Sequence, residues 1–173
     1  MSDAVIRPGT EQDLPALVEI YNHYVQTTHI TFDTEPFTVD TRRPWLERFA
    51  ETGCHRLLVA ERAGRPVGYA SSLPFRDKPA YDRSVETTIY LEAGAVGAGL
   101  GERLYGVLLE ELRADPLAHR AYAGVALPNT RSIALHERMG FEPVGTFREA
   151  GYKFDTFWDV SWLELAVSRS LGG

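Results

Sequence analysis

The chain has 173 residues, of which 44% are hydrophobic and 24% are charged, and this mixture excludes a disordered tail, a collagen and a coiled-coil rod. Its 18 basic and 24 acidic residues give a net charge of −6, without the basic stripe that binding to nucleic acid needs. We therefore expect a single domain over residues 1–173 that acts on a small molecule and not on nucleic acid.

The N-terminal segment lacks the positive start and the apolar stretch of a signal peptide, and no run reaches the ~18 apolar residues of a membrane span. We therefore expect a cytoplasmic protein without a membrane segment. Apolar periodicity then predicts a strand over 4–7, a helix that Thr10 or Asp13 caps, and a weakly patterned helix over 39–52 that Gly53 ends.

The middle of the chain alternates polar and apolar residues most clearly over 84–92. Because successive side chains of a strand point to opposite faces, this spacing places Glu86, Thr88 and Tyr90 on one face of a strand. The strand leads into a glycine-rich segment, 94–101, which opens a helix with a strong apolar stripe. Before it, the pattern predicts strands over 56–61 and 66–73 and a charged, proline-rich loop over 74–83.

The last third of the chain continues the alternation of strands and helices. The predicted elements are a strand over 121–127, a helix over 129–139 and a pair of strands over 141–154 and 157–167. Helices between strands in the middle and a hairpin at the end predict an α/β protein with a mixed sheet covered by helices. The single cysteine, Cys54, excludes an intrachain disulfide, and the five histidines are too scattered to predict a metal site.

The glycine-rich segment is a candidate phosphate-binding loop. Gly97, Gly99 and Gly101 let a ligand approach the backbone, and the first-turn amides of the helix after them carry the positive end of the helix dipole. Tight packing alone explains these glycines equally well. A dinucleotide fold would place the loop after the first strand, and a nucleoside triphosphate loop would need Gly-Lys-Ser or Gly-Lys-Thr, so both nucleotide readings fail.

The same segment resembles the acetyl-CoA loop of the GCN5-related N-acetyltransferases. That loop follows the fourth strand and has Gln or Arg, two variable residues, Gly, any residue, and Gly or Ala. The corresponding residues are Val96-Gly97-Ala98-Gly99-Leu100-Gly101, which match in their glycines and depart from the pattern at Val96.

Several further stretches resemble the phosphinothricin N-acetyltransferase branch and its amino-acid-acetylating relatives. They are spread over nearly the whole chain, and together they are specific although each alone is not. They are Tyr21-Asn22-His23-Tyr24, Phe32-Asp33-Thr34-Glu35-Pro36, Ala80-Tyr81-Asp82, Val85-Glu86-Thr87-Thr88-Ile89-Tyr90, Leu127-Pro128-Asn129 with Ser132 and Leu135-His136-Glu137, and Ala150-Gly151-Tyr152-Lys153.

The resemblance implies the fold of this family, a mostly antiparallel mixed sheet flanked by helices, and acetyl-CoA as co-substrate without a metal. It also implies that Glu86 is the general base for the attacking amine, which requires burial to raise its pKa from ~4.3 toward neutrality. The implied cofactor-binding residues are Ile89, Tyr90 and Leu91 for the pantetheine arm, Gly97, Ala98, Gly99, Leu100, Gly101 and Glu102 for the pyrophosphate, and Asn129 and Ser132 at the start of the next helix.

His136 stands where many members of the superfamily carry a tyrosine as general acid. It is therefore a candidate acid for the departing thiolate, and a surface or buried structural histidine remains an equal alternative. Asn129 also has an ordinary role, since asparagine is a favoured helix N-cap.

An amino-acid acceptor would present its carboxylate to a cation. Three cations lie in the loop before Glu86, namely Arg76, Lys78 and Arg83, and the aromatic residues Phe32, Tyr81 and Tyr90 could line the side-chain pocket. The expected acceptor is thus a small amino acid such as phosphinothricin, methionine sulfone or methionine sulfoximine. A polyamine, a peptide N-terminus and a CoA-binding module without turnover stay open as alternatives.

Aromatic residues crowd the C-terminal strands more than one small core readily uses. This crowding indicates a dimer surface or a substrate mouth, and the resemblance implies a homodimer. The residues are Phe147, Tyr152, Phe154, Phe157, Trp158 and Trp162.

Overall fold

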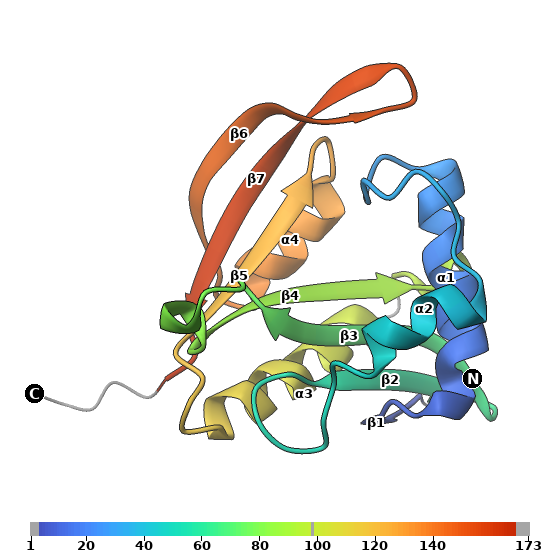
Figure 1. Cartoon of the computed structure of the whole chain (residues 1–173), viewed down its shortest axis with the longest axis vertical. Coiled ribbons are helices and arrows are strands. Elements are labelled where there is room, and N and C mark those ends of the chain that lie inside the picture. Colours follow the sequence, from blue (N-terminus) through green and yellow to red (C-terminus); the bar gives the residue numbers. More distant parts are fainter. Residues whose placement is uncertain (1–3, 98, 169–173) are drawn as a thin grey trace, which may run out of the picture.

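The computed structural model describes residues 4–97 and 99–168, so Ala98 of the expected pyrophosphate loop lies outside the described residues. Within these residues, seven strands form one sheet in the order β1-β2-β3-β4-β5-β7-β6 (Figure 1). The strands are β1 (Val5–Pro8), β2 (Leu57–Arg62), β3 (Arg65–Pro74), β4 (Ser84–Leu91), β5 (Arg120–Ala126), β6 (Glu142–Lys153) and β7 (Thr156–Ala166). Only β4 and β5 run parallel in this sheet, which confirms the expected mixed, mostly antiparallel fold.

Helices cover both faces of the sheet (Figure 1). In the described part of the chain they are α1 (Leu14–Thr27), α2 (Val39–Leu46), α3 (Leu100–Ala114) and α4 (Thr130–Arg138), with short 3-10 turns at Glu11–Asp13, Pro79–Tyr81 and Ala93–Ala95. The apolar stripe of α3 is buried in the main core together with residues of β2, β3 and β5. A second cluster joins α1 and residues around α2 to the opposite face of β2 and β3.

Strands β4 and β5 diverge soon after they begin. Their pairing ends at Glu86, which lies opposite Tyr122, although β4 continues to Leu91 and β5 to Ala126. The parallel arrangement follows from the crossover through α3, because parallel neighbours need such a connection. The sheet is therefore split into two halves that are joined by backbone pairing only near the start of β4, and the far part of β4 has an open edge toward β5.

The second helix is shorter than the sequence predicts. It ends at Leu46 and not at 52, with Pro44 inside it and no residue of the helix fully buried. The weak apolar pattern of 39–52 therefore had no continuous buried face to sustain a longer helix, and a proline removes a backbone donor from the ladder. No helix within residues 4–97 and 99–168 is both long enough and apolar enough to cross a membrane.

Candidate active site

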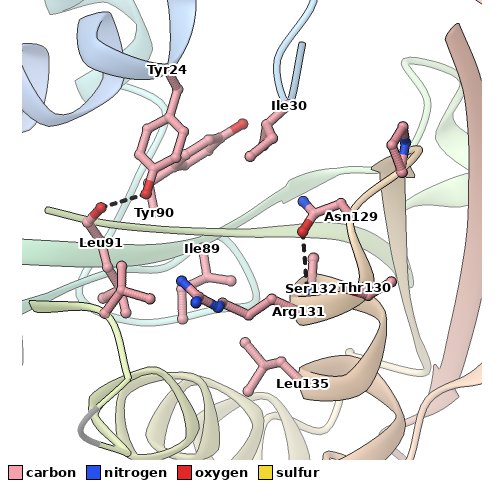
Figure 2. Close-up of a pocket in the computed structure, with 12 residues that line it drawn as sticks. Tyr24, Ile30, Ile89, Tyr90, Leu91, Asn129, Thr130, Arg131, Ser132 and Leu135 are labelled. Atoms are coloured by element: carbon pink, nitrogen blue, oxygen red, sulfur yellow. Dashed lines mark hydrogen bonds between the residues drawn. The ribbon is translucent and has the colours of Figure 1, made fainter. Parts of the chain in front are cut away.

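A cavity of about 460 Å³ lies between the end of β4 and the start of α4, on the side where β4 has no strand partner (Figure 2). The end of β4 forms one wall, the start of α4 forms the other, and the end of α1 and the loop after it close one side. The lining residues are Tyr24, Ile30, Ile89, Tyr90, Leu91, Val96, Pro128, Asn129, Thr130, Arg131, Ser132 and Leu135. An apolar wall with a few polar groups is typical of a small-molecule site.

The start of α4 supplies the polar side of this cavity. The side chain of Asn129 accepts a hydrogen bond from the Ser132 amide at 3.1 Å, which confirms Asn129 as the N-cap of the helix (Figure 2). Arg131 adds a positive charge to the same wall. The sequence interpretation had not singled out Arg131, and its only signal was its place in the first turn after Asn129.

Tyr24 was also missed as a site residue, although it belongs to the first of the motifs quoted above. Its hydroxyl donates a hydrogen bond to the carbonyl of Leu91 at 2.6 Å, and its ring packs against Tyr90 (Figure 2). The bond satisfies one backbone acceptor of β4 beyond the point where β5 turns away.

The glycine loop lies beside the same cavity through Val96. Gly97 and Gly99 have φ angles of 102° and 72°, a left-handed conformation that favours glycine, and Gly99 is the N-cap of α3. The side chain of Glu102 forms an ion pair with Arg138 of α4. Glu102 therefore ties α3 to α4 through its side chain, which leaves only its backbone amide for a ligand.

A second cavity of about 230 Å³ lies on the sheet face that α1 and α2 cover. As the alternation of β4 predicts, Glu86, Thr88 and Tyr90 all line it. The full lining is Tyr21, Arg42, Trp45, Arg48, Tyr69, Ser71, Leu73, Pro74, Glu86, Thr88 and Tyr90. Tyr90 lines both cavities, so the two cavities are neighbours on either side of this residue.

Glu86 is partly buried in the smaller cavity, and its environment changes its acidity. Burial raises the pKa of the Glu86 carboxyl above its usual value, and the charge of Arg76 opposes that rise. Beyond Glu86 along the floor, the hydroxyls of Ser71 and Thr88 share a hydrogen bond of 2.9 Å. Burial also raises the pKa of Tyr90, to about 12, so its phenol is neutral at pH 7.

The cations and aromatics predicted for the substrate lie mostly outside both cavities. Arg76 is exposed and stacks on Phe75 with its guanidinium carbon 3.9 Å from the ring centre. Its charge reaches Glu86, as described above. The side chains of Lys78, Tyr81 and Arg83 are exposed, and neither cavity is lined by any of them.

His136 is buried in the core at 3% exposure, between the rings of Tyr105 and Phe141. Its Nδ1 donates to the carbonyl of Ser132 at 2.8 Å, and its Nε2 has no hydrogen-bond partner among the described residues. Burial lowers the pKa of His136, so the ring is neutral and Nε2 carries no proton. His136 does not line either of the two cavities.

The loop between α1 and α2, residues 28–38, bridges the two halves of the sheet. The buried Lys153 of β6 donates from its Nζ to the carbonyl of Thr31 at 2.8 Å. The predicted substrate residue Phe32 lies against Gly151, where a Cβ would overlap with the Phe32 ring. We call these contacts the loop clasp, and the hydroxyl of Tyr21 extends it to the smaller cavity by its hydrogen bond to Thr31 at 2.6 Å.

Within the described residues, no group of three or more histidine, cysteine, aspartate or glutamate side chains is placed to hold a metal ion. The groups that line the two cavities are a carboxyl of raised pKa, tyrosine and threonine hydroxyls, arginines and backbone amides.

Comparison with known proteins matches residues 6–162 to the model of the acetyltransferase (GNAT) domain. The chain is 54% identical over 165 residues to a phosphinothricin N-acetyltransferase of Streptomyces coelicolor, with 94% of this chain and 96% of the relative covered. It is 33% identical to an L-methionine sulfoximine/L-methionine sulfone acetyltransferase of Pseudomonas aeruginosa, with 94% of each covered. Among solved structures, the phosphinothricin acetyltransferase from Sinorhizobium meliloti in complex with AcCoA has a TM-score of 0.90 and 27% identity, covering 96% of this chain and 90% of that chain.

Proposed function

Because this chain belongs to the GNAT family of acetyltransferases, we propose that it transfers the acetyl group of acetyl-CoA to the amino group of a small amino acid such as phosphinothricin, methionine sulfone or methionine sulfoximine. The names of the similar proteins support this acceptor class. The observation that carries the proposal is a pair of cavities that are both lined by Tyr90, with the raised-pKa carboxyl of Glu86 in the smaller one.

The larger cavity suits the acetyl-pantetheine arm of acetyl-CoA, which supplies an activated thioester. The open edge of β4 fits this assignment, since an amide-bearing arm can pair with Ile89, Tyr90 and Leu91 as an added strand. The side chains of Asn129 and Ser132 face the same space. The pyrophosphate is assigned to the amides of Gly97, Gly99, Leu100, Gly101 and Glu102, where the dipole of α3 favours negative charge, and to the position of Ala98, which lies outside the described residues.

The acceptor is assigned to the smaller cavity, with Glu86 as general base. The amine must lose a proton before its lone pair can attack the thioester carbon, and Glu86 accepts that proton directly or through a water. For the oxyanion of the tetrahedral intermediate we assign a backbone amide near Tyr90 or Leu91; the alternation of β4 favours the amide of Leu91, because that of Tyr90 points toward β3. The carbon–sulfur bond then breaks, and CoA leaves as a thiolate.

The proposal does not use His136 as the acid that protonates the thiolate. A neutral His136 with its proton on Nδ1 has none to donate from Nε2, and the ring lies in the core. Arg76 has one proposed role, since its positive charge lowers the pKa of Glu86 and so favours the ionised base. The exposed residues Lys78, Tyr81 and Arg83 have no role in the proposed reaction and belong to a solvated loop. Phe32 acts only through its contact with Gly151 in the loop clasp.

The first test is release of free thiol from acetyl-CoA against a panel of acceptors. The panel holds phosphinothricin, methionine sulfone, methionine sulfoximine, the common amino acids, spermidine and a short peptide. We expect one amino-acid analogue to exceed the other acceptors clearly. Preference for spermidine or the peptide would contradict the acceptor class, and acetyl-CoA binding without turnover of any acceptor would favour a binding module.

We further propose that the protein is a cytoplasmic homodimer of one N-acetyltransferase domain and that it protects its host from such amino-acid analogues. Support for the dimer comes from exposed aromatic side chains on the β6–β7 hairpin, which a second copy would cover. They are Phe147, Tyr152, Phe154 and Phe157. Sedimentation equilibrium is expected to give twice the chain mass, and Phe157→Glu is expected to shift it toward the monomer.

A further inference from the structure

Arg42 of α2 lies in a cage of three aromatic rings at the roof of the smaller cavity. Its guanidinium carbon is 4.4 Å from the ring centre of Tyr21, 4.7 Å from that of Phe37 and 4.3 Å from that of Trp45. Stacking on aromatic faces holds a guanidinium in one orientation and leaves its in-plane N–H groups for hydrogen bonds. Arg42 lines the cavity that also contains Glu86.

This guanidinium has no carboxylate partner among the described residues. Its neighbour Arg43, on the same helix, forms ion pairs with Glu11 and Asp40, whereas no acidic oxygen of the described chain lies within ion-pair distance of Arg42. Arg42 interacts with the hydroxyl of Tyr69 but has no carboxylate to balance its charge. A partly buried arginine of this kind is a ready binding group for an anion, because a charged group loses solvation when it is buried and regains it from an opposite charge.

The placement of Arg42 matches the two charges of an amino acid. Strand β4 lays Glu86, Thr88 and Tyr90 in that order along the floor. The guanidinium of Arg42 lies over the ring of Tyr21, whose centre is 5.0 Å from that of the Tyr90 ring, so it is near the Tyr90 end. The cavity therefore has an anionic group at one end and a cationic group near Tyr90, which also lines the larger cavity.

We propose that Arg42 binds the α-carboxylate of the acceptor and thereby selects free amino acids over other amines. This inference rests on the proposed function, since it needs an amino acid in the smaller cavity. With the carboxylate held by Arg42, the adjacent α-amino group lies on the floor between Tyr90 and Glu86, close to where the thioester arrives, and its proton reaches Glu86 through a water. A cavity of about 230 Å³ is also below the ~300–1,000 Å³ of sites for larger ligands, which agrees with a small acceptor.

Other cations are less suited to this task. Arg48 lines the cavity, but its side chain is exposed and no ring cage holds it. Arg76 stacks on Phe75 and acts on Glu86 rather than lining the cavity. A binding site for carboxylate needs an oriented donor, and Arg42 has the geometry for it.

The test compares Arg42→Gln with the matched variant Arg43→Gln, using L-methionine sulfone and its α-carboxamide as acceptors. For Arg42→Gln we expect kcat/KM for L-methionine sulfone to fall about 10- to 100-fold, the scale of one lost charge-assisted hydrogen bond. We expect little change with the carboxamide and none in the KM for acetyl-CoA. Arg43→Gln is expected to behave like the wild type, and Arg42→Lys to recover part of the loss.

The outcomes separate this inference from the proposed function. If Arg42→Gln lowers kcat/KM equally for L-methionine sulfone and for its carboxamide, Arg42 has only a structural role and the inference is wrong. The inference is also wrong if the wild-type enzyme acetylates the two acceptors equally well. A wild-type enzyme that acetylates no amino acid would overturn the proposed function. Titration calorimetry then tests Arg42 without turnover, by measuring the binding of L-methionine sulfone to the wild type and to Arg42→Gln in the presence of CoA. Equal affinity of the two proteins would contradict the role proposed for Arg42.

Discussion

At the scale of single residues, the acidity of Glu86 determines when the proposed base can work. A carboxylate accepts a proton only when it is ionised, and burial has raised the pKa of Glu86. We expect kcat/KM to rise with pH through this raised value, above the ~4.3 of a free glutamate. Glu86→Gln is expected to lower kcat about 100-fold with the KM for acetyl-CoA unchanged. Steady-state kinetics over pH 5–9 checks this, and turnover near the wild-type level at neutral pH would contradict the assignment.

The same residue has a consequence for stability. A folded-state pKa that lies above the unfolded value contributes stability below the unfolded pKa, and that contribution is lost as pH rises through the folded pKa. Glu86 at pH 7 therefore opposes folding, and Gln in its place avoids the buried charge. We expect Glu86→Gln to melt at a higher temperature than the wild type at pH 7 and at the same temperature below about pH 4. Calorimetric melting at both pH values tests it, with Glu61→Gln as the control for a carboxylate that is ion-paired to Arg7.

At the scale of elements, the loop clasp depends on the absence of a side chain at residue 151. The ring of Phe32 occupies the space that a Cβ would need, so Gly151→Ala must displace Phe32 and the loop around it. We expect a loss of about 1–3 kcal/mol in the free energy of unfolding, the usual cost of overpacking, and a higher KM for the acceptor.

A double-mutant cycle provides the control for this prediction. Phe32→Ala removes the ring, so the cost of Gly151→Ala should largely disappear in the Phe32→Ala background. Equal costs of Gly151→Ala in both backgrounds, measured by urea unfolding, would mean that the two residues are not coupled.

The elements also show how far the sequence leads. The strands, the shared face of Glu86, Thr88 and Tyr90, and the N-cap at Asn129 follow from local rules of alternation and capping, and the structure confirms them. The place of Arg42 in the smaller cavity could not be predicted, because its helix has weak periodicity and only the tertiary structure brings Arg42 to the same cavity as β4.

Two other misses have the same origin in tertiary structure. The hydrogen bond from Lys153 to Thr31 joins residues that are 122 positions apart, and no local sequence pattern predicts it. The burial of His136 depends on its packing between Tyr105 of α3 and Phe141, although its helix is amphipathic in the sequence. Resemblance to a family identifies positions, but burial and hydrogen bonds determine what the residue at a position can do.

At the scale of the whole molecule, the divergence of β4 from β5 predicts a response to the co-substrate. The two halves of the sheet share backbone pairing only as far as Glu86, which leaves the amides toward Leu91 without a neighbour strand on the β5 side. If the pantetheine arm pairs there, CoA should slow hydrogen exchange in the peptide over 87–92. The β2 peptide over 57–62, which is paired on both sides, should change little and serves as the internal control. Exchange rates in 87–92 that are independent of saturating CoA would exclude strand-like pairing.

That divergence also determines which strand edges other molecules can reach. An exposed edge is a template for pairing with a foreign strand, and proteins blunt it with short strands, prolines or bulges. Both outer edges of this sheet are blunted, since β1 has four residues and ends at Pro8, and β6 pairs with shifts of register. The edge of β4 has no register shift against β3, but it faces the larger cavity, whose other wall is the start of α4. The start of α4 thus shields the open edge of β4 from foreign strands and leaves room only for a thin chain.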